Sequence, residues 1–200
     1  MESATTPVLI LTGPPGSGKT ITAHRLGKMF ERAVHLESDW FFHAIGSGFV
    51  EPWMPDSKEQ NETIMRAVAD AAADFGLGGY FTIVDGILSP PWFFRPVTER
   101  LHDRGLTVHY AILRPTLEIA IHRALADTSP DRLSDQVVIR QLYSDFLNTG
   151  ELEAHVIDNS ELSIEETARR VADLMRSGAL SVVASAGGPR SAGGLARGQG

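Results

Sequence analysis

The octapeptide GPPGSGKT, from Gly13 to Thr20, directly follows the apolar run PVLIL. Its spacing, G-x-x-x-x-G-K-[ST], suits the binding of a nucleotide's phosphates, because glycines let successive backbone N–H groups turn inward toward phosphate oxygens. The helix expected next adds the partial positive charge of its N-terminus. Lys19 would reach the β- and γ-phosphates, and the Thr20 hydroxyl would bind Mg²⁺. The residues predicted to hold the nucleotide here are Gly13, Gly16, Ser17, Gly18, Lys19 and Thr20.

An aspartate closes the apolar run FTIVDG, Phe81–Gly86. In a domain with such a phosphate loop, an Asp at the end of a neighbouring strand holds Mg²⁺, so Asp85 and Thr20 are the predicted metal-binding residues. The competing interpretation is a simple Asp-Gly turn, which is a common turn sequence. The phosphate loop favours the metal role.

A second aspartate, Asp39, lies in the run HLESDWFF, just past the expected second strand. Open α/β sheets bind ligands beyond their strand ends, and a carboxylate there can accept the proton of a substrate hydroxyl as that hydroxyl attacks the γ-phosphate. The alternative is that Ser38 or Asp39 caps the helix that follows, a role that is compatible with catalysis. Glu37 is the reserve candidate for the base.

Two segments rich in Gly, Pro and aromatic residues, 39–56 and 89–96, contain all three tryptophans. Both follow expected strand ends and are predicted to lie over the ligand crevice, where an aromatic-lined cleft is the usual binding site. The alternative is that the rings seal a small satellite core. Basic side chains are scarce between Asp39 and Val97, which argues against a multiply anionic substrate. The predicted acceptor-binding residues are Asp39, Trp40, His43, Trp53, Trp92 and Arg95.

The segment 113–146 carries several arginines and a break at Thr128–Asp131 that separates two expected helices. Arginines on a flexible segment over the phosphates would stabilise the charge on the transferring group and exclude water. Taken singly, each arginine is better explained as a solvated surface residue. Arg123 and Arg132 flank the break and are the predicted catalytic cations, in a lid around residues 123–140.

A parallel sheet is needed to hold these residues, and short β-rich runs do alternate with helical patterns along the chain, which is typical of βαβ units. Strands are expected at Val8–Leu11, Ala33–Leu36, Tyr80–Val84, Leu106–Leu113 and His155–Ile157. Helices are expected at Lys19–Arg32, Ser57–Phe75, Thr116–Leu125, Ser134–Phe146 and Ser163–Met175. Capping boxes are expected at Ser57 with Gln60 and at Ser163 with Glu166.

Composition and charge indicate the extent of the domain, the class of partner and the location of the protein. Residues 1–177 are interpreted as a single domain, and the Gly/Ala/Ser-rich residues 178–200 as a disordered tail that buries too little apolar surface to offset its ordering entropy. The net charge of −7, without any Lys/Arg run, argues against nucleic acid or an anionic membrane as the main partner. The chain has no cysteine, no signal-peptide pattern and no apolar stretch of membrane-spanning length, so a cytoplasmic location is expected.

In order along the chain, the motifs GPPGSGKT, ESD and VDG, an arginine-bearing segment and VIDNS resemble the small P-loop kinases over roughly Val8–Met175. That group includes gluconate and shikimate kinases and chloramphenicol phosphotransferase-like bacterial ATP-binding proteins. The resemblance implies a three-layer α/β P-loop NTPase fold, with a five-stranded parallel sheet in the order 2-3-1-4-5 and helices on both faces. It also implies ATP and Mg²⁺ as cosubstrates and phosphoryl transfer to a small-molecule hydroxyl. By position, Asp39 resembles the substrate-binding acid or base and Arg123 the lid arginine, and Asp158, Asn159 and Ser160 would lie beside the adenine.

Shikimate kinases surround their anionic substrate with arginines, and this chain offers few. We therefore expect a neutral or cationic acceptor with a flat or apolar body, such as an antibiotic, a nucleoside or a modified sugar. Two other functions remain open: a regulatory P-loop ATPase that acts as a conformational switch, and a zeta-toxin-like kinase of a nucleotide sugar. A polynucleotide 5′-hydroxyl kinase is disfavoured by the acidic charge balance.

Overall fold

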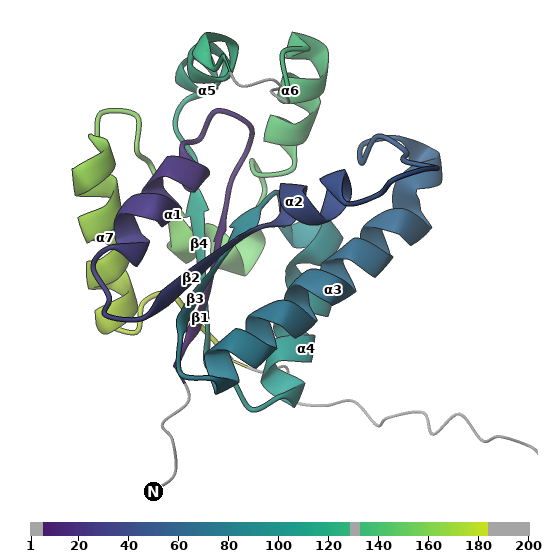
Figure 1. The fold of residues 1–200 in the computed structure, drawn as a ribbon. Helices are drawn as coiled ribbons and strands as arrows, with labels where there is room; N and C mark the ends of the chain where they lie inside the picture. Colours follow the sequence, from purple (N-terminus) through teal and green to yellow (C-terminus); the bar gives the residue numbers. More distant parts are fainter. Residues whose placement is uncertain (1–5, 129–132, 184–200) are drawn as a thin grey trace, which may run out of the picture.

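A parallel sheet with helices on both faces forms the centre of the computed structural model, which describes residues 6–128 and 133–183 (Figure 1). Its parallel strands stand in the order β2-β3-β1-β4-β5, which confirms the predicted topology. The strands are β1 Val8–Thr12, β2 Ala33–Glu37, β3 Phe81–Gly86, β4 Val108–Leu113 and β5 Val156–Ile157. Because these strands run parallel, their carboxyl ends meet at one edge of the sheet, where the candidate site residues gather.

Helices fill the intervals between the strands. The α-helices of the described residues are α1 Lys19–Gly27, α2 Ser38–His43, α3 Lys58–Leu77, α4 Arg95–Asp103, α5 Leu117–Ala126, α6 Gln136–Ser144 and α7 Ile164–Arg176. Shorter helical segments are η1 Pro55–Ser57, η2 Pro90–Phe94 and η3 Gly150–His155. Within residues 6–128 and 133–183, no helix combines the length and apolarity that crossing a membrane requires.

The sheet separates two apolar cores. The inner strands are buried on both faces, so their sequences are nearly continuous apolar runs. Successive residues of β1 point to opposite faces: Ile10 packs in the core covered by α3 and α4, and Leu9 in the core covered by α1 and α7. The two helical layers lie on either side of the sheet in Figure 1.

Local capping agrees with the sequence at the last helix. Ser163 Oγ accepts a hydrogen bond from the Glu166 amide, and Glu166 Oε2 accepts one from the Ser163 amide, so the predicted capping box of α7 is confirmed. At α6 the prediction was one residue early: Asp135, and not Ser134, accepts hydrogen bonds from the first amides of the helix.

The capping box predicted at α3 is wrong. Ser57 Oγ donates to two backbone carbonyl oxygens of the preceding loop, at 2.7 and 2.8 Å, and makes no cap for the helix. Gln60 pairs instead with the backbone of Val50, as its Nε2 donates to the carbonyl oxygen and its Oε1 accepts from the amide. Both side chains hold the Gly/Pro-rich loop against the start of α3.

A sixth strand corrects the predicted end of the domain. Strand β6, Ser181–Val182, pairs antiparallel with the amino half of β4, and Leu180 is fully buried. A tail was predicted from residue 178 onward, but within it Leu180 is buried and Ser181–Val182 pair with the sheet. Residues 184–200, predicted as the rest of that tail, lie outside the described residues, as does most of the predicted break at 128–131.

The outer edge of β4 is shared by two strands. Strand β5 pairs with its carboxyl half and β6 with its amino half. Between them, the Tyr110 amide donates to the carbonyl oxygen of Leu180 at 2.9 Å, and the Tyr110 carbonyl oxygen lies 2.8 Å from His155 Nδ1. Both halves of this edge therefore have hydrogen-bond partners.

Candidate active site

The loop GPPGSGKT connects β1 to α1, as predicted, and its glycines are required by close packing. Gly13, Gly16 and Gly18 all have positive φ values, of 153°, 75° and 82°, which L side chains rarely adopt. A Cβ on Gly16 would collide with the carbonyl oxygen of Ala120 in α5, and one on Gly13 with that of Leu113 in β4. The loop is thus held between neighbouring elements with its backbone curled.

The N-terminus of α1 is left free of protein partners. Its N-cap residue, Gly18, has no side chain to accept from the first amides, and the first turn contains no acidic residue. Lys19 and Thr20 lie at this end, half-buried, and no hydrogen bond or ion pair joins either side chain to the rest of the described chain. Free amides, a positive helix end and an unpaired lysine together make a site for an anion such as a phosphate group.

Asn159 holds the phosphate loop from outside. Its Nδ2 donates a 2.9 Å hydrogen bond to the carbonyl oxygen of Ser17, and the residue is only 3 % exposed. Asn159 was predicted to lie beside the adenine, and the structure places its side chain under the phosphate loop. This positioning contact was not visible in the sequence, because the two residues are far apart along the chain.

Asp158 and Ser160 bond mainly to each other and to the start of α5. Ser160 Oγ donates to Asp158 Oδ1 at 2.5 Å and accepts from the Thr116 amide at 2.9 Å. The hydrogen bonds from Ser160 lower the pKa of Asp158 below its usual value. The segment is therefore a loop fixed between the Gly13–Thr20 loop and the start of α5.

Arg123 closes this arrangement from α5. Its Nη2 donates to the carbonyl oxygens of Asn159 and Ser160, both at 3.2 Å, so the guanidinium rests on this loop. A role for Arg123 on the phosphates stays a prediction. Arg132, the other predicted lid cation, lies outside the described residues.

Asp85 is a buried strand residue, and the alternative of an Asp-Gly turn is wrong. Asp85 and Gly86 both belong to β3, opposite Leu11 and Thr12 of β1. Asp85 is 2 % exposed; its Oδ2 lies 3.2 Å from Nε2 of His35, and its buried Oδ1 has no hydrogen-bond partner in the described chain. A buried carboxylate oxygen without a partner fits the oxygen ligand that Mg²⁺ prefers.

His35 was missed by the sequence analysis. It lies on β2, and its ring pairs with Asp85 across the two adjacent strands. The only available signal was its position two residues before Glu37, which puts both side chains on one face of the strand. Burial raises the pKa of Glu37 above its usual value, although the neighbouring His35 opposes the shift.

Asp39 lies in the first turn of α2 with its side chain exposed. Its Oδ1 is 3.5 Å from Ser38 Oγ, and neither side chain caps the helix, so the capping alternative is wrong. A Cβ on Gly86 would collide with Ser38 Oγ, which shows how closely α2 approaches the end of β3. Asp39 is therefore next to the strand end that carries Asp85.

Two of the predicted acceptor-binding residues line one pocket. Trp53, from the loop before α3, and Trp92, from η2, lie in a hollow of about 370 Å³ at the start of α3. Lys58 and Glu62, which form an ion pair at 4.0 Å, provide its charged groups. The remaining lining residues are Met54, Pro55, Ser57, Asn61, Pro91 and Phe93.

The structure does not bring the other predicted acceptor residues into this pocket. Trp40 is half-exposed on α2, with its ring 6.2 Å from that of His35. His43 and Arg95 are exposed at the end of α2 and the start of α4. Asp39 is not among the residues that line the pocket either.

The prediction that the aromatic segments lie over the crevice is wrong for most of the phenylalanines; of the tryptophans, Trp53 and Trp92 line the pocket and Trp40 does not. Phe42 and Phe93 are buried in the core under α3, and Phe41 and Phe94 pack against it. Phe49 remains exposed. The phenylalanines anchor these segments to the sheet, which leaves the larger rings at the surface.

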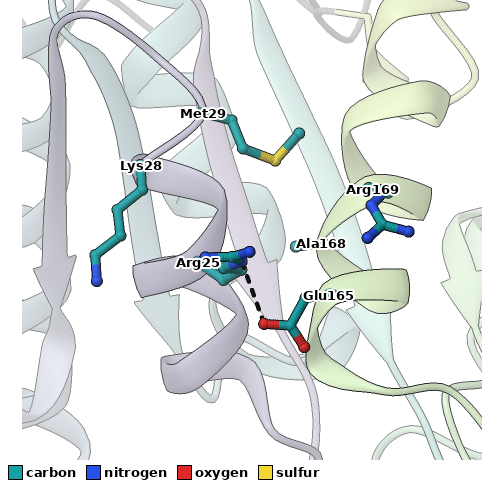
Figure 2. A pocket seen from close by; sticks show the side chains of 6 residues that line it. All are labelled: Arg25, Lys28, Met29, Glu165, Ala168 and Arg169. Carbon is teal, nitrogen blue, oxygen red and sulfur yellow. Dashed lines mark ion pairs between the residues drawn. The ribbon is translucent and has the colours of Figure 1, made fainter.

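A second hollow, of about 220 Å³, lies between α1 and α7 (Figure 2). An ion pair between Arg25 and Glu165, at 3.3 Å, spans the two helices at this place. Met29 and Ala168 supply its apolar lining, and Lys28 and Arg169 its remaining charges. None of the predicted site residues belongs to this hollow, which is a junction between helices.

No protein-family model matches the chain, and no curated protein matches it in sequence. Solved structures do share its fold. A tunicamycin resistance protein from Deinococcus radiodurans has a TM-score of 0.65 at 23% identity, with 85% of this chain and 95% of that chain covered. Shikimate kinase from Acinetobacter baumannii, in complex with shikimate, has a TM-score of 0.62 at 20% identity, with 87% and 95% covered. A sugar kinase from Janibacter sp. HTCC2649 has a TM-score of 0.60 at 18% identity, with 88% and 94% covered. The chain has the fold of the small P-loop kinases.

Proposed function

We propose that the protein transfers the γ-phosphoryl group of ATP to a hydroxyl of a small molecule. The observation that carries this proposal is the free N-terminus of α1, where the curled glycine loop presents Lys19 and Thr20. The neighbouring strand β3 pairs with β1, which leads into this loop, and carries the carboxylate of Asp85 near its end. An anion site next to a buried carboxylate is the arrangement that nucleotide and metal binding require.

Each residue has a distinct task in this reaction. The acceptor oxygen forms a bond to the γ-phosphorus while the bond from that phosphorus to the bridging oxygen of ADP breaks, and the hydroxyl proton passes to the Asp39 carboxylate. Lys19 and the amides of the loop stabilise the negative charge that shifts toward the leaving ADP. Thr20 and Asp85 would hold Mg²⁺, which when bound neutralises charge on the phosphate oxygens.

The acceptor we propose is neutral or cationic and has a flat or apolar body. Trp53 and Trp92 offer ring faces on which such a body can stack and over which a cationic group can sit. No arginine lines this pocket, and its one lysine, Lys58, is already paired with Glu62 at 4.0 Å, so a sugar acid would find no unpaired cation there. The tunicamycin resistance protein among the neighbours is consistent with an antibiotic acceptor, whereas the shikimate complex represents the anionic alternative.

An ADP-release screen tests the function. The purified protein is incubated with ATP, Mg²⁺ and a library of hydroxylated metabolites, nucleosides and antibiotics, and mass spectrometry identifies the phosphorylated products. Lys19→Ala should lower transfer by at least about a hundredfold, the scale expected for removal of one charge-stabilising donor. Lys28→Ala, an exposed lysine just after the same helix, is the matched control and should retain activity.

Two outcomes contradict the proposal. Full activity of Lys19→Ala would show that the loop does not bind the nucleotide as proposed. ADP release that no acceptor stimulates, and that yields no phosphorylated product from any compound, would instead support the regulatory ATPase.

A further inference from the structure

Two histidines and a glutamate converge on the face of the sheet that α1 covers. His24 of α1, His35 of β2 and Glu37 of β2 each offer one ligand atom, and these atoms all lie within 4.8 Å of one another. His24 Nε2 is 3.9 Å from Glu37 Oε1, and the two imidazole rings meet edge to face with centroids 4.7 Å apart. The proposed phosphoryl transfer assigns no task to His24 or His35, and Glu37 is only the reserve candidate for its base.

Burial and orientation distinguish this cluster from a chance group of surface residues. The side chain of His35 is 10 % exposed and its Nε2 lies 3.2 Å from Asp85 Oδ2. Nδ1 of the same ring is buried and has no hydrogen-bond partner among residues 6–128 and 133–183. Histidines that bind metals commonly have one ring nitrogen held by a carboxylate while the other serves as ligand. Asp85 therefore provides the support that such a ligand needs.

We infer that His24, His35 and Glu37 form a binding site for a transition-metal ion such as Zn²⁺. Two imidazole nitrogens and one carboxylate oxygen are ligands typical of zinc, with bond lengths of about 2.0–2.2 Å. Two ligand atoms of one tetrahedral ion are then about 3.4 Å apart. The three ligand atoms, now within 4.8 Å of one another, would reach this separation by side-chain rotation. The exposed His24 is the side chain with room to move, as it is 61 % exposed.

Ligand chemistry separates this site from the proposed magnesium site. Mg²⁺ prefers oxygen ligands and keeps much of its water, whereas imidazole favours Zn²⁺, Co²⁺, Ni²⁺ and Cu²⁺. The two sites share Asp85, which would support His35 in one and bind Mg²⁺ in the other. Transition-metal binding without nucleotide thus goes beyond the proposed kinase activity and can be measured separately from it.

Cobalt is a suitable probe because tetrahedral Co²⁺ absorbs visible light much more strongly than hexaaqua Co²⁺. The full chain is stripped with a chelator, titrated with Co²⁺ and then with Zn²⁺, in buffer that contains millimolar Mg²⁺ and no nucleotide. We expect one Co²⁺ per chain, visible bands that Zn²⁺ abolishes, and a rise in the melting temperature with Zn²⁺, because a ligand that binds only the folded chain stabilises it.

His24→Ala should weaken Co²⁺ and Zn²⁺ binding by about 10- to 100-fold or more, at least the loss caused by removing a ligand's supporting residue. His122→Ala, an exposed histidine on α5, is the matched control and should bind like the wild type. Glu37→Gln replaces another proposed ligand with a side chain of nearly the same volume, and it should independently weaken metal binding. Equal binding by His24→Ala and His122→Ala, or no binding to the wild type beyond that of weak surface sites, would overturn the inference. Neither result would bear on phosphoryl transfer.

Discussion

The Asn159 side chain donates a hydrogen bond to the carbonyl oxygen of Ser17, although 142 positions separate the two residues along the chain. The bond ties the phosphate loop to the segment that follows β5, and Arg123 donates hydrogen bonds to two backbone carbonyl oxygens of that segment. The shape of the GPPGSGKT loop therefore depends on a residue that lies outside it.

Asn159→Ala should loosen the phosphate loop. The variant leaves the Ser17 carbonyl oxygen without this partner, at a cost of about 1–2 kcal/mol in the free energy of unfolding. We expect the KM for ATP to rise more than the KM for the acceptor. Asn148→Ala, which removes an exposed amide side chain, is the control. Unchanged ATP binding in Asn159→Ala, measured by calorimetry, would mean that the loop keeps its shape without this bond.

Asp39→Asn should keep ATP affinity and slow phosphoryl transfer by roughly a hundredfold or more, the scale of general base catalysis. The amide preserves the size of the side chain but cannot accept the proton of the acceptor hydroxyl. Single-turnover rates and ATP binding by calorimetry separate the two effects. If ATP affinity collapses while the rate is maintained, Asp39 belongs to the nucleotide site.

Trp53→Ala should raise the acceptor KM about tenfold while leaving the ATP KM unchanged, because a stacked ring contributes about 1 kcal/mol beyond the area that it buries. Trp40→Ala is the matched control, since Trp40 lies outside the pocket. We also expect gluconate and shikimate to be poor substrates beside at least one aromatic, heterocyclic or amine-bearing alcohol. Efficient use of gluconate, together with normal acceptor kinetics in Trp53→Ala, would refute the pocket as the acceptor site.

A chain that ends at Ser177 should be less stable than one that ends at Val183 by about 3 kcal/mol. The shorter chain loses the burial of Leu180, worth about 1.5–3 kcal/mol, and the hydrogen bonds of β6 to β4. Urea unfolding of the two chains measures the difference. Equal midpoints would show that β6 adds nothing to the domain.

His109 should make the fold sensitive to mild acid. Burial lowers the pKa of His109 below its usual value of 6.5. The unfolded chain therefore binds a proton at a pH where the folded chain does not, so stability falls as the pH drops below about 6.5 and levels off below the folded pKa. The free energy of unfolding between pH 7.5 and 5 should fall less in His109→Gln than in the wild type. His122→Gln, at an exposed histidine, is the control and should keep the wild-type pH dependence of the free energy of unfolding. The same pH dependence in His109→Gln as in the wild type would show that His109 is not the group responsible.

Much of the fold follows from local sequence signals. The apolar runs of β1, β3 and β4 predict buried parallel strands, and the glycines of the loop predict its conformation because only they fit its φ values. Contacts between distant segments were not predictable. The pairing of His35 with Asp85 depends on strand register, which no single segment specifies.

Only part of the site could be predicted, because contacts between distant segments also determine which side chains come together. Trp53 and Trp92 come together because two loops pack at the start of α3, whereas Trp40 is directed elsewhere by α2, whose Phe42 is buried in the core. Composition is also a poor guide to structure at the end of the described chain. The group around Leu180 is too short to show a strand pattern, and its Gly, Ala and Ser neighbours conceal it.

The shared outer edge of β4 has a consequence for biosynthesis. The chain emerges from the ribosome with its amino end first, so β4 is made well before either segment that covers its edge. Until residues 156–182 have been made, the growing chain exposes an unpaired edge of apolar sequence, which is a template for pairing with other chains. Aggregation during translation, and dependence on chaperones, should therefore be greatest in this late interval and should end when β6 closes the sheet.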